Sequence, residues 1–177
     1  MLTENVKVSS AVPETVDALT WMGYYLFFLF MLTLNSFKEE LLFRSYPIEN
    51  LKEKTTGIWT IILSASIIFS IVHHMLEPFT WTAFISRFLF GVFTCQVYIV
   101  TRSLWPIIGI HNGSNWFLIT FSDAGNWKLG GLLLLTTGVD NQPLEIDSLY
   151  FLMSRGVAVI IMYLWMRKWN HSKTIDI

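Results

Sequence analysis

Long apolar segments dominate this chain and limit how it can fold. The first of them, Leu19–Phe37, has nineteen residues and contains no Asp, Glu, Lys or Arg. A bilayer has a hydrocarbon core about 30 Å thick, which a helix of about 20 apolar residues can cross. Only 14% of the residues in the whole chain are charged, against about 25% in average soluble domains. The further segments of this kind are Gly57–Leu76, Phe79–Val100, Ser103–Phe121 and Leu149–Met166.

These segments predict an all-α fold, a polytopic helical bundle in a membrane with about five transmembrane helices. Leu129–Val139 is too short to span, and we expect a half-helix or a re-entrant segment there. The domain is expected to comprise residues 19–169, between polar tails at 1–18 and 170–177. The net charge of −1 gives no reason to expect a nucleic-acid partner. Membrane lipids are the partners that the composition implies.

The basic residues outside the spans indicate the orientation. With five spans, eight Lys or Arg residues collect on one side of the membrane and two on the other. The eight are Lys38, Arg44, Lys52, Lys54, Arg102, Arg167, Lys168 and Lys173, and the two are Lys7 and Lys128. Cytoplasmic loops are enriched in Lys and Arg, so we expect the N-terminus outside and the eight basic residues at the cytoplasmic side. The polar start of the chain lacks the basic residues of a secretory signal peptide.

Three polar motifs interrupt or follow the apolar segments. The sequence KEELLFRSY at Lys38–Tyr46 directly follows the first segment, FSIVH ends at His73, and HNGSN begins at His111. Residues four apart share a helix face, which predicts an ion pair between Glu40 and Arg44 and places Asn115 beside His111. Glu39 is offset by about 100° and faces elsewhere. Ionisable residues inside a membrane are costly and are functional candidates by default.

The depths of these motifs indicate that they meet. Depth is counted from the cytoplasmic side at about 1.5 Å per helical residue, with the first helix continuing past Tyr46 to about Asn50. Glu39 then lies about 15 Å deep, His111 about 12 Å, Asn115 about 18 Å, and His73 about 18 Å if its helix is counted from Ile61. We therefore predict that these side chains share one layer and one cavity open toward the cytoplasm.

Each motif alone has a simpler interpretation. A pair such as Glu40 and Arg44 is common on the surface of a soluble helix, and a single buried His is often just a hydrogen-bonded packing residue. His74 points away from His73 and is interpreted as structural or interfacial, and Cys95 as a packing residue. The combination of two Glu, two His and one Asn at one depth is what favours a functional site.

The three motifs, in this order, resemble the signature of the CPBP family of intramembrane proteases. EELLFR is similar to its EExxxR motif, FSIVH to its FxxxH motif, and His111–Asn115 to its HxxxN motif. That family includes type II CAAX prenyl endopeptidases and bacteriocin-processing or immunity-associated Abi proteins. The likeness covers about Phe37–Trp116, and it departs from the family at Ser45 and Arg102, where Gly is common.

The resemblance implies an intramembrane endopeptidase that acts on a membrane-associated or lipidated protein or peptide. It implies Glu39 as the general base, His73 as a residue that holds and activates the water, and His111 and Asn115 as hydrogen-bond donors to the oxyanion. Glu40 and Arg44 are expected to form a supporting pair that takes no part in the chemistry.

Alternatives to this mechanism stay open at the level of sequence. Glu39, His73 and His111 could form a zinc site with an open position for water, but Asn115 suits an oxyanion donor better and no HExxH is present, so we favour a reaction without a cofactor. A non-catalytic scaffold or immunity-type protein could keep the same fold. A small proton-relaying transporter is disfavoured by the lack of a repeat.

Overall fold

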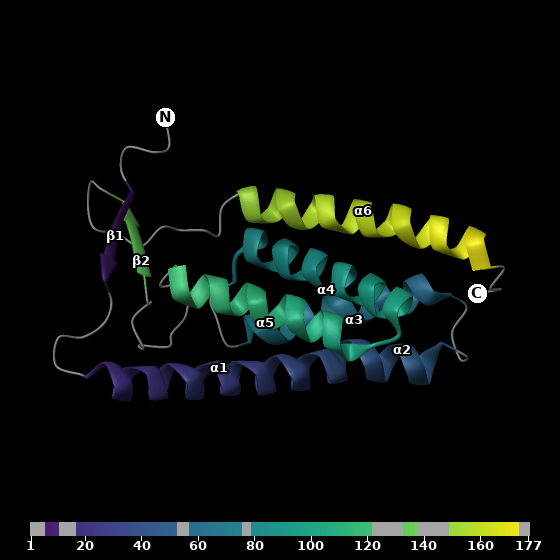
Figure 1. The fold of residues 1–177 in the computed structure, drawn as a ribbon. Helices are drawn as coiled ribbons and strands as arrows, with labels where there is room; N and C mark the ends of the chain where they lie inside the picture. The colour runs from purple at the N-terminus through teal and green to yellow at the C-terminus, as the bar shows by residue number, and fades with distance from the viewer. Residues whose placement is uncertain are drawn as a thin grey trace. The chain divides into compact units, whose positions relative to one another are not determined.

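The computed structural model describes residues 6–10, 17–52, 57–75, 79–121, 133–137 and 149–173, and helices dominate this part of the chain (Figure 1). Each of the five predicted apolar segments contains a helix, and the predicted helical membrane bundle is confirmed. Two of the described helical segments, Ala18–Leu51 and Trp81–Thr101, are long and apolar enough to cross a membrane, and Ile58–His74 is a shorter apolar helix. The helices are α1 (Ala18–Glu40), the π-helix η1 (Leu41–Ser45), α2 (Tyr46–Leu51), α3 (Ile58–His74), α4 (Trp81–Thr101), α5 (Leu104–Phe121) and α6 (Leu149–Lys173).

The chain forms two compact units, which are described separately. Unit 1 comprises Met1–Ser36 and Ile110–Ile146, and unit 2 comprises Phe37–Gly109 and Asp147–Ile177. Unit 1 contains an antiparallel pair of strands, β1 (Val6–Ser10) and β2 (Leu133–Thr137), in which Val6 pairs with Thr137 and Ser10 with Leu133.

Strand β2 differs from the half-helix expected at Leu129–Val139. Its described residues form an extended ladder with β1, and the other residues of that segment lie outside the described part of the chain. An isolated helix of fewer than about 12 residues is marginal, whereas pairing with a second strand satisfies the backbone hydrogen bonds of both segments. The partner strand comes from the segment predicted to be a polar tail.

Helix α1 begins at an N-terminal cap. The carboxylate of Asp17 accepts hydrogen bonds from the backbone N–H groups of Leu19 at 3.1 Å and Thr20 at 3.0 Å. These donors would otherwise have no partner in the first turn of a helix. Hydrogen bonds from Thr20, chiefly from its side chain, hold the pKa of Asp17 below its usual value.

The helical path continues from α1 through η1 and α2 without a break, as the depth argument required. The backbone N–H of Tyr46 bonds to the carbonyl of Leu41, which is the wider spacing of a π-helix. Pro47 explains the wider turn, because it has no N–H to donate and its ring would clash with the carbonyl of Phe43 in a regular α-helix. The π-helix thus lies within the EExxxR motif.

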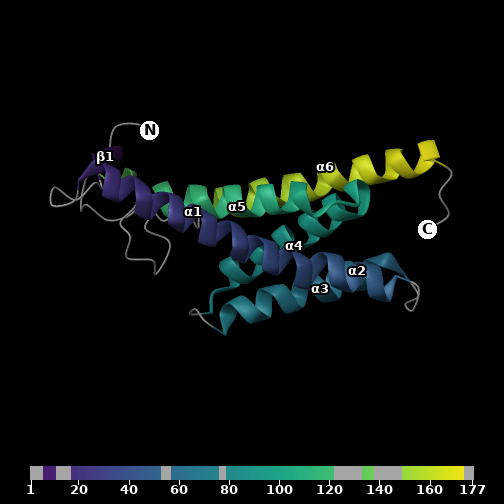
Figure 2. The same cartoon turned by 60° about the horizontal axis from the view of Figure 1, so that its bottom comes forward.

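Helix α4 is the centre of unit 2 and packs against both α3 and α6 (Figure 2). Helices α3 and α4 approach closely at Gly91: a Cβ atom added to this residue would lie 2.9 Å from the Cβ of Ser66 on α3. On the α6 side, the guanidinium of Arg155 donates to the hydroxyl of Ser86 and lies over the ring of Phe90, 5.2 Å from its centroid. The guanidinium of Arg155 is therefore held against α4.

Candidate active site

Glu39 and His73 face each other in unit 2. Glu39 lies in the last turn of α1 and His73 in the last turn of α3, and Glu39 Oε2 is 3.6 Å from His73 Nε2. Both side chains are mostly buried, with 13% and 26% of their surfaces exposed. Two of the predicted site residues, from two different motifs, thus lie next to each other.

The backbone of α3 orients the imidazole of His73. Its Nδ1 lies 2.8 Å from the carbonyl oxygen of Phe69. Because a carbonyl oxygen only accepts, Nδ1 carries a proton, and in the neutral form of the ring Nε2 is therefore unprotonated and faces Glu39. A carboxylate and a bare ring nitrogen are both acceptors, so a water molecule beside the two atoms could donate one hydrogen to each of them.

Phe69 connects the first two motifs. Its ring centroid lies 4.3 Å from that of His73 and 5.5 Å from that of Phe43. The guanidinium carbon of Arg44 lies over the same ring at 4.0 Å, a cation–π contact. The aromatic residue of FxxxH therefore holds both the imidazole of that motif and the arginine of EExxxR. No role for Phe69 was predicted from the sequence, although its place in the FxxxH motif was a signal for one.

The predicted pair between Glu40 and Arg44 is present and fully buried. Arg44 Nε is 3.1 Å from Glu40 Oε2, and both residues are 0% exposed. Arg44 Nε also donates to the hydroxyl of Thr94 on α4 at 2.8 Å. Sequence reasoning missed Thr94, because nothing local marks a threonine fifty residues away as a partner. Glu40 and Arg44 thus fasten the EExxxR segment to α4.

His111 and Asn115 lie one turn apart on α5 in unit 1. His111 is 4% exposed and Asn115 is half-buried. The adjacent face of α5 is tied to α1, because the amide of Asn112 donates to the hydroxyl of Thr33 at 2.8 Å and the indole of Trp116 donates to the hydroxyl of Tyr25. Since these two residues belong to the other unit, the prediction that they share a cavity with Glu39 and His73 stays a prediction.

His74 makes contacts of its own. Its Nε2 lies 3.4 Å from Arg87 Nη1, and its ring centroid lies 5.0 Å from that of Phe79. These contacts agree with a structural role. Cys95 is free and 0% exposed, as a packing residue would be.

A bound metal ion needs several donor side chains placed close together. Among the residues that the structure describes, no group of three or more His, Cys, Asp or Glu side chains is placed to hold one. Zinc sites of hydrolases use three protein ligands and a water. Because His111 belongs to unit 1 and Glu39 and His73 to unit 2, the alternative zinc set of Glu39, His73 and His111 stays a prediction.

No curated protein and no solved structure matches the chain significantly. The family model described as type II CAAX prenyl endopeptidase Rce1-like matches residues 21–117, which is more than half of the chain and includes all three motifs. This match confirms the resemblance to the CPBP intramembrane proteases, and the chain belongs to the Rce1-like family of type II CAAX prenyl endopeptidases.

Proposed function

We propose that this protein is an intramembrane endopeptidase that hydrolyses a peptide bond in a membrane-associated or lipidated protein or peptide. The family supports an activity of the CAAX-endopeptidase type in general. The observation that carries the proposal for this chain is the approach of Glu39 Oε2 to His73 Nε2 at 3.6 Å. The two atoms come from two of the three family motifs and lie at the ends of two helices.

In the proposed mechanism, Glu39 is the general base and His73 holds the water. The Nδ1–H of His73 is committed to the carbonyl of Phe69, so Nε2 can accept one hydrogen of the water. Glu39 takes the other hydrogen as the water oxygen attacks the substrate carbonyl carbon.

The remaining steps involve the third motif. His111 and Asn115 are proposed to donate hydrogen bonds to the oxyanion that forms on the carbonyl oxygen. Glu39 then returns its proton to the leaving amine nitrogen as the carbon–nitrogen bond breaks. Glu40 and Arg44 stay out of the chemistry and hold the EExxxR segment in place through Thr94.

No step of this mechanism is routed through a metal ion, because Asn115 suits an oxyanion donor better than a ligand of a borderline-soft metal. We expect cleavage to continue in the presence of a zinc chelator such as 1,10-phenanthroline. Cleavage that stops with the chelator and returns with added zinc would contradict the metal-free mechanism.

The first test is cleavage of a defined peptide by purified protein in proteoliposomes. The probe is a quenched fluorescent peptide that ends in a prenylated Cys followed by three residues, the form that the family name describes. Native protein should cleave it. Glu39→Gln keeps size and polarity but removes the base, so kcat should fall by about 10²-fold or more, with no change in melting temperature.

Asp17→Asn is the matched control for removing one carboxylate. Asp17 is exposed at the start of α1, and Asn caps a helix about as well as Asp. This variant should cleave like the native protein. A native protein that leaves the peptide intact, or a Glu39→Gln variant that cleaves normally, would overturn the proposal and favour a non-catalytic scaffold.

The natural substrate requires an unbiased search. Membrane peptides from cells with native protein are compared with those from cells with the Glu39→Gln variant. A substrate should accumulate uncut in the variant cells, and its cleavage products should be missing there. Because the variant keeps the fold, the comparison isolates proteolysis from binding.

A further inference from the structure

Arg102 adopts a backbone conformation that its residue type disfavours. It follows α4 with φ 51° and ψ 31°, in the left-handed region, and it is the only non-glycine residue with positive φ among those that the structure describes. The conformation closes the helix, since the N–H of Arg102 bonds to the carbonyl of Tyr98 at 2.8 Å. A Cβ atom is unfavourable in this region, and glycine is the usual residue. An arginine at such a place points to a role for its side chain.

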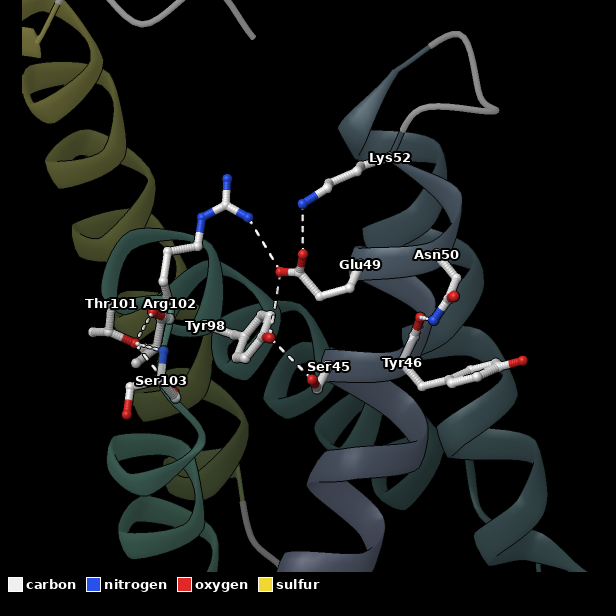
Figure 3. Close-up of polar contacts among 10 residues, drawn as sticks. Ser45, Tyr46, Glu49, Asn50, Lys52, Tyr98, Thr101, Arg102 and Ser103 are labelled. Atoms are coloured by element: carbon white, nitrogen blue, oxygen red, sulfur yellow. Dashed lines mark hydrogen bonds and ion pairs between the residues drawn. The ribbon is translucent and has the colours of Figure 1, made fainter.

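The side chain of Arg102 binds a carboxylate on a different helix. Its Nη1 lies 3.2 Å from Glu49 Oε1, and the hydroxyl of Tyr98 donates to the same oxygen at 3.3 Å (Figure 3). The hydroxyl of Ser45 lies 2.9 Å from that of Tyr98 and, because the Tyr98 proton goes to Glu49, Ser45 is the donor. Lys52 binds the other oxygen of Glu49. We call Glu49, Tyr98 and Arg102 the Glu49 clamp.

The Glu49 clamp joins two elements that carry functional motifs. Glu49 lies in α2, on the continuous helical path that also carries Glu39. Only Arg102 and Ser103 connect α4 to α5, and α5 begins at Leu104. The ion pair therefore fixes the start of the HxxxN helix against the end of the EExxxR helix, within unit 2.

We propose that Arg102 is a positioning residue, which acts through Glu49 to set the direction of α5 and hence the place of the proposed oxyanion donors His111 and Asn115. This inference rests on the proposed function. His111 lies about 10 Å along the helix from Leu104, so a tilt of about 6° at the first turn moves it by about 1 Å. A misplacement of that size can cost about 10²-fold in rate.

The ion pair between Arg102 and Glu49 is too exposed to contribute much to the stability of the fold, which distinguishes a positioning role from a stabilising one. The side chain of Arg102 is 56% exposed and that of Glu49 is 37% exposed. Exposed ion pairs contribute little to folding free energy. Loss of the pair should therefore lower kcat while leaving the melting temperature and KM nearly unchanged, a combination that a structural role does not produce.

The test measures cleavage of the prenylated peptide in proteoliposomes. Arg102→Gln and Glu49→Gln should each lower kcat by about tenfold to 10²-fold. The double variant should be no worse than either single one, because both changes break the same contact. Arg102→Lys should recover part of the rate. Lys52→Gln is the matched control, because Lys52 binds the same carboxylate from the same helical path and joins no second element, and it should keep the native kcat.

The variant Arg102→Gly should affect the melting temperature and kcat differently. Glycine removes the backbone cost of the left-handed conformation, so the melting temperature should stay or rise. It also removes the guanidinium, so kcat should fall as in Arg102→Gln. If kcat rises and falls together with the melting temperature in Arg102→Gly and Arg102→Gln, the positioning role is overturned.

A second readout needs no substrate. Amide hydrogen exchange over residues 103–110 should be faster in Arg102→Gln than in native protein or in Lys52→Gln, because the first turn of α5 loses its attachment. Unchanged exchange and unchanged kcat in Arg102→Gln, with Glu39→Gln inactive, would overturn the clamp and leave the protease intact. A native protein without activity would instead overturn the proposed function, and the exchange measurement would still decide whether the clamp holds α5.

Discussion

Glu39 and Glu40 are neighbours in the chain but have different surroundings. Glu40 is 0% exposed and is paired with Arg44, whereas the side chain of Glu39 is 13% exposed and faces the imidazole of His73. A rotation of about 100° between successive helical residues separates the two environments. One carboxylate is neutralised by a fixed cation, and the other faces a group that can share a proton with it.

This difference predicts opposite effects of two similar substitutions. Glu40→Gln leaves Arg44 as an uncompensated buried charge, which costs about 3–5 kcal/mol. Its main effect should be a lower melting temperature in detergent and a lower yield of folded protein. Arg44→Leu should do the same from the other side, and the double variant Glu40→Gln with Arg44→Leu should recover part of the loss. A well-folded but inactive Glu40→Gln, beside a Glu39→Gln that still cleaves, would show that the two roles are reversed.

At the scale of elements, the approach of α3 to α4 determines where His73 can lie. A Cβ atom at Gly91 would meet Ser66 Cβ at 2.9 Å and Ser66 Cα at 3.0 Å. Both atoms belong to or adjoin the backbone, so relief requires the helices to separate. The position of α3, and with it the imidazole at its end, depends on this contact.

Gly91→Ala should therefore destabilise the protein by about 1–3 kcal/mol, as overpacking does. Cleavage should also fall, because His73 moves with α3. Gly156→Ala is the matched control, since nothing lies within 4 Å of a Cβ atom added there. It should be neutral or stabilising by about 0.5–1 kcal/mol, because alanine favours a helix. Thermal melting of both variants measures the difference, and equal melting temperatures would contradict the close contact.

At the scale of the whole molecule, the charge distribution predicts the topology. Five spans place the N-terminus outside and the C-terminus inside. Ser10→Cys and Ser172→Cys, each in a Cys95→Ala background, should react with a membrane-impermeant reagent from opposite sides of intact cells. Labelling of both positions from the same side would contradict five full spans.

Much of this molecule could be predicted from local patterns. Apolar segments near the length of a bilayer predicted the helices, and each described helix begins within two residues of its segment. The ends agree less well, because α6 continues past Met166 to Lys173 and the first helical path continues past Phe37 to Leu51. The spacing of Glu40 and Arg44 predicted their ion pair, because residues four apart meet on one helix regardless of what surrounds it. The π-helix before Pro47 was missed, although the proline was a local signal for it.

Contacts between distant segments were decided only by the tertiary structure. Thr94 reaches Arg44, Arg102 reaches Glu49, and β1 pairs with β2 across most of the chain. No periodicity encodes these partners, since they depend on which helix faces pack together and how closely. The sequence by itself determined the helices, the order of the motifs and the ion pair between Glu40 and Arg44, which lie one helical turn apart. Packing alone decided that Glu39 faces His73 across 3.6 Å, because that distance depends on how α3 lies against η1, α2 and α4.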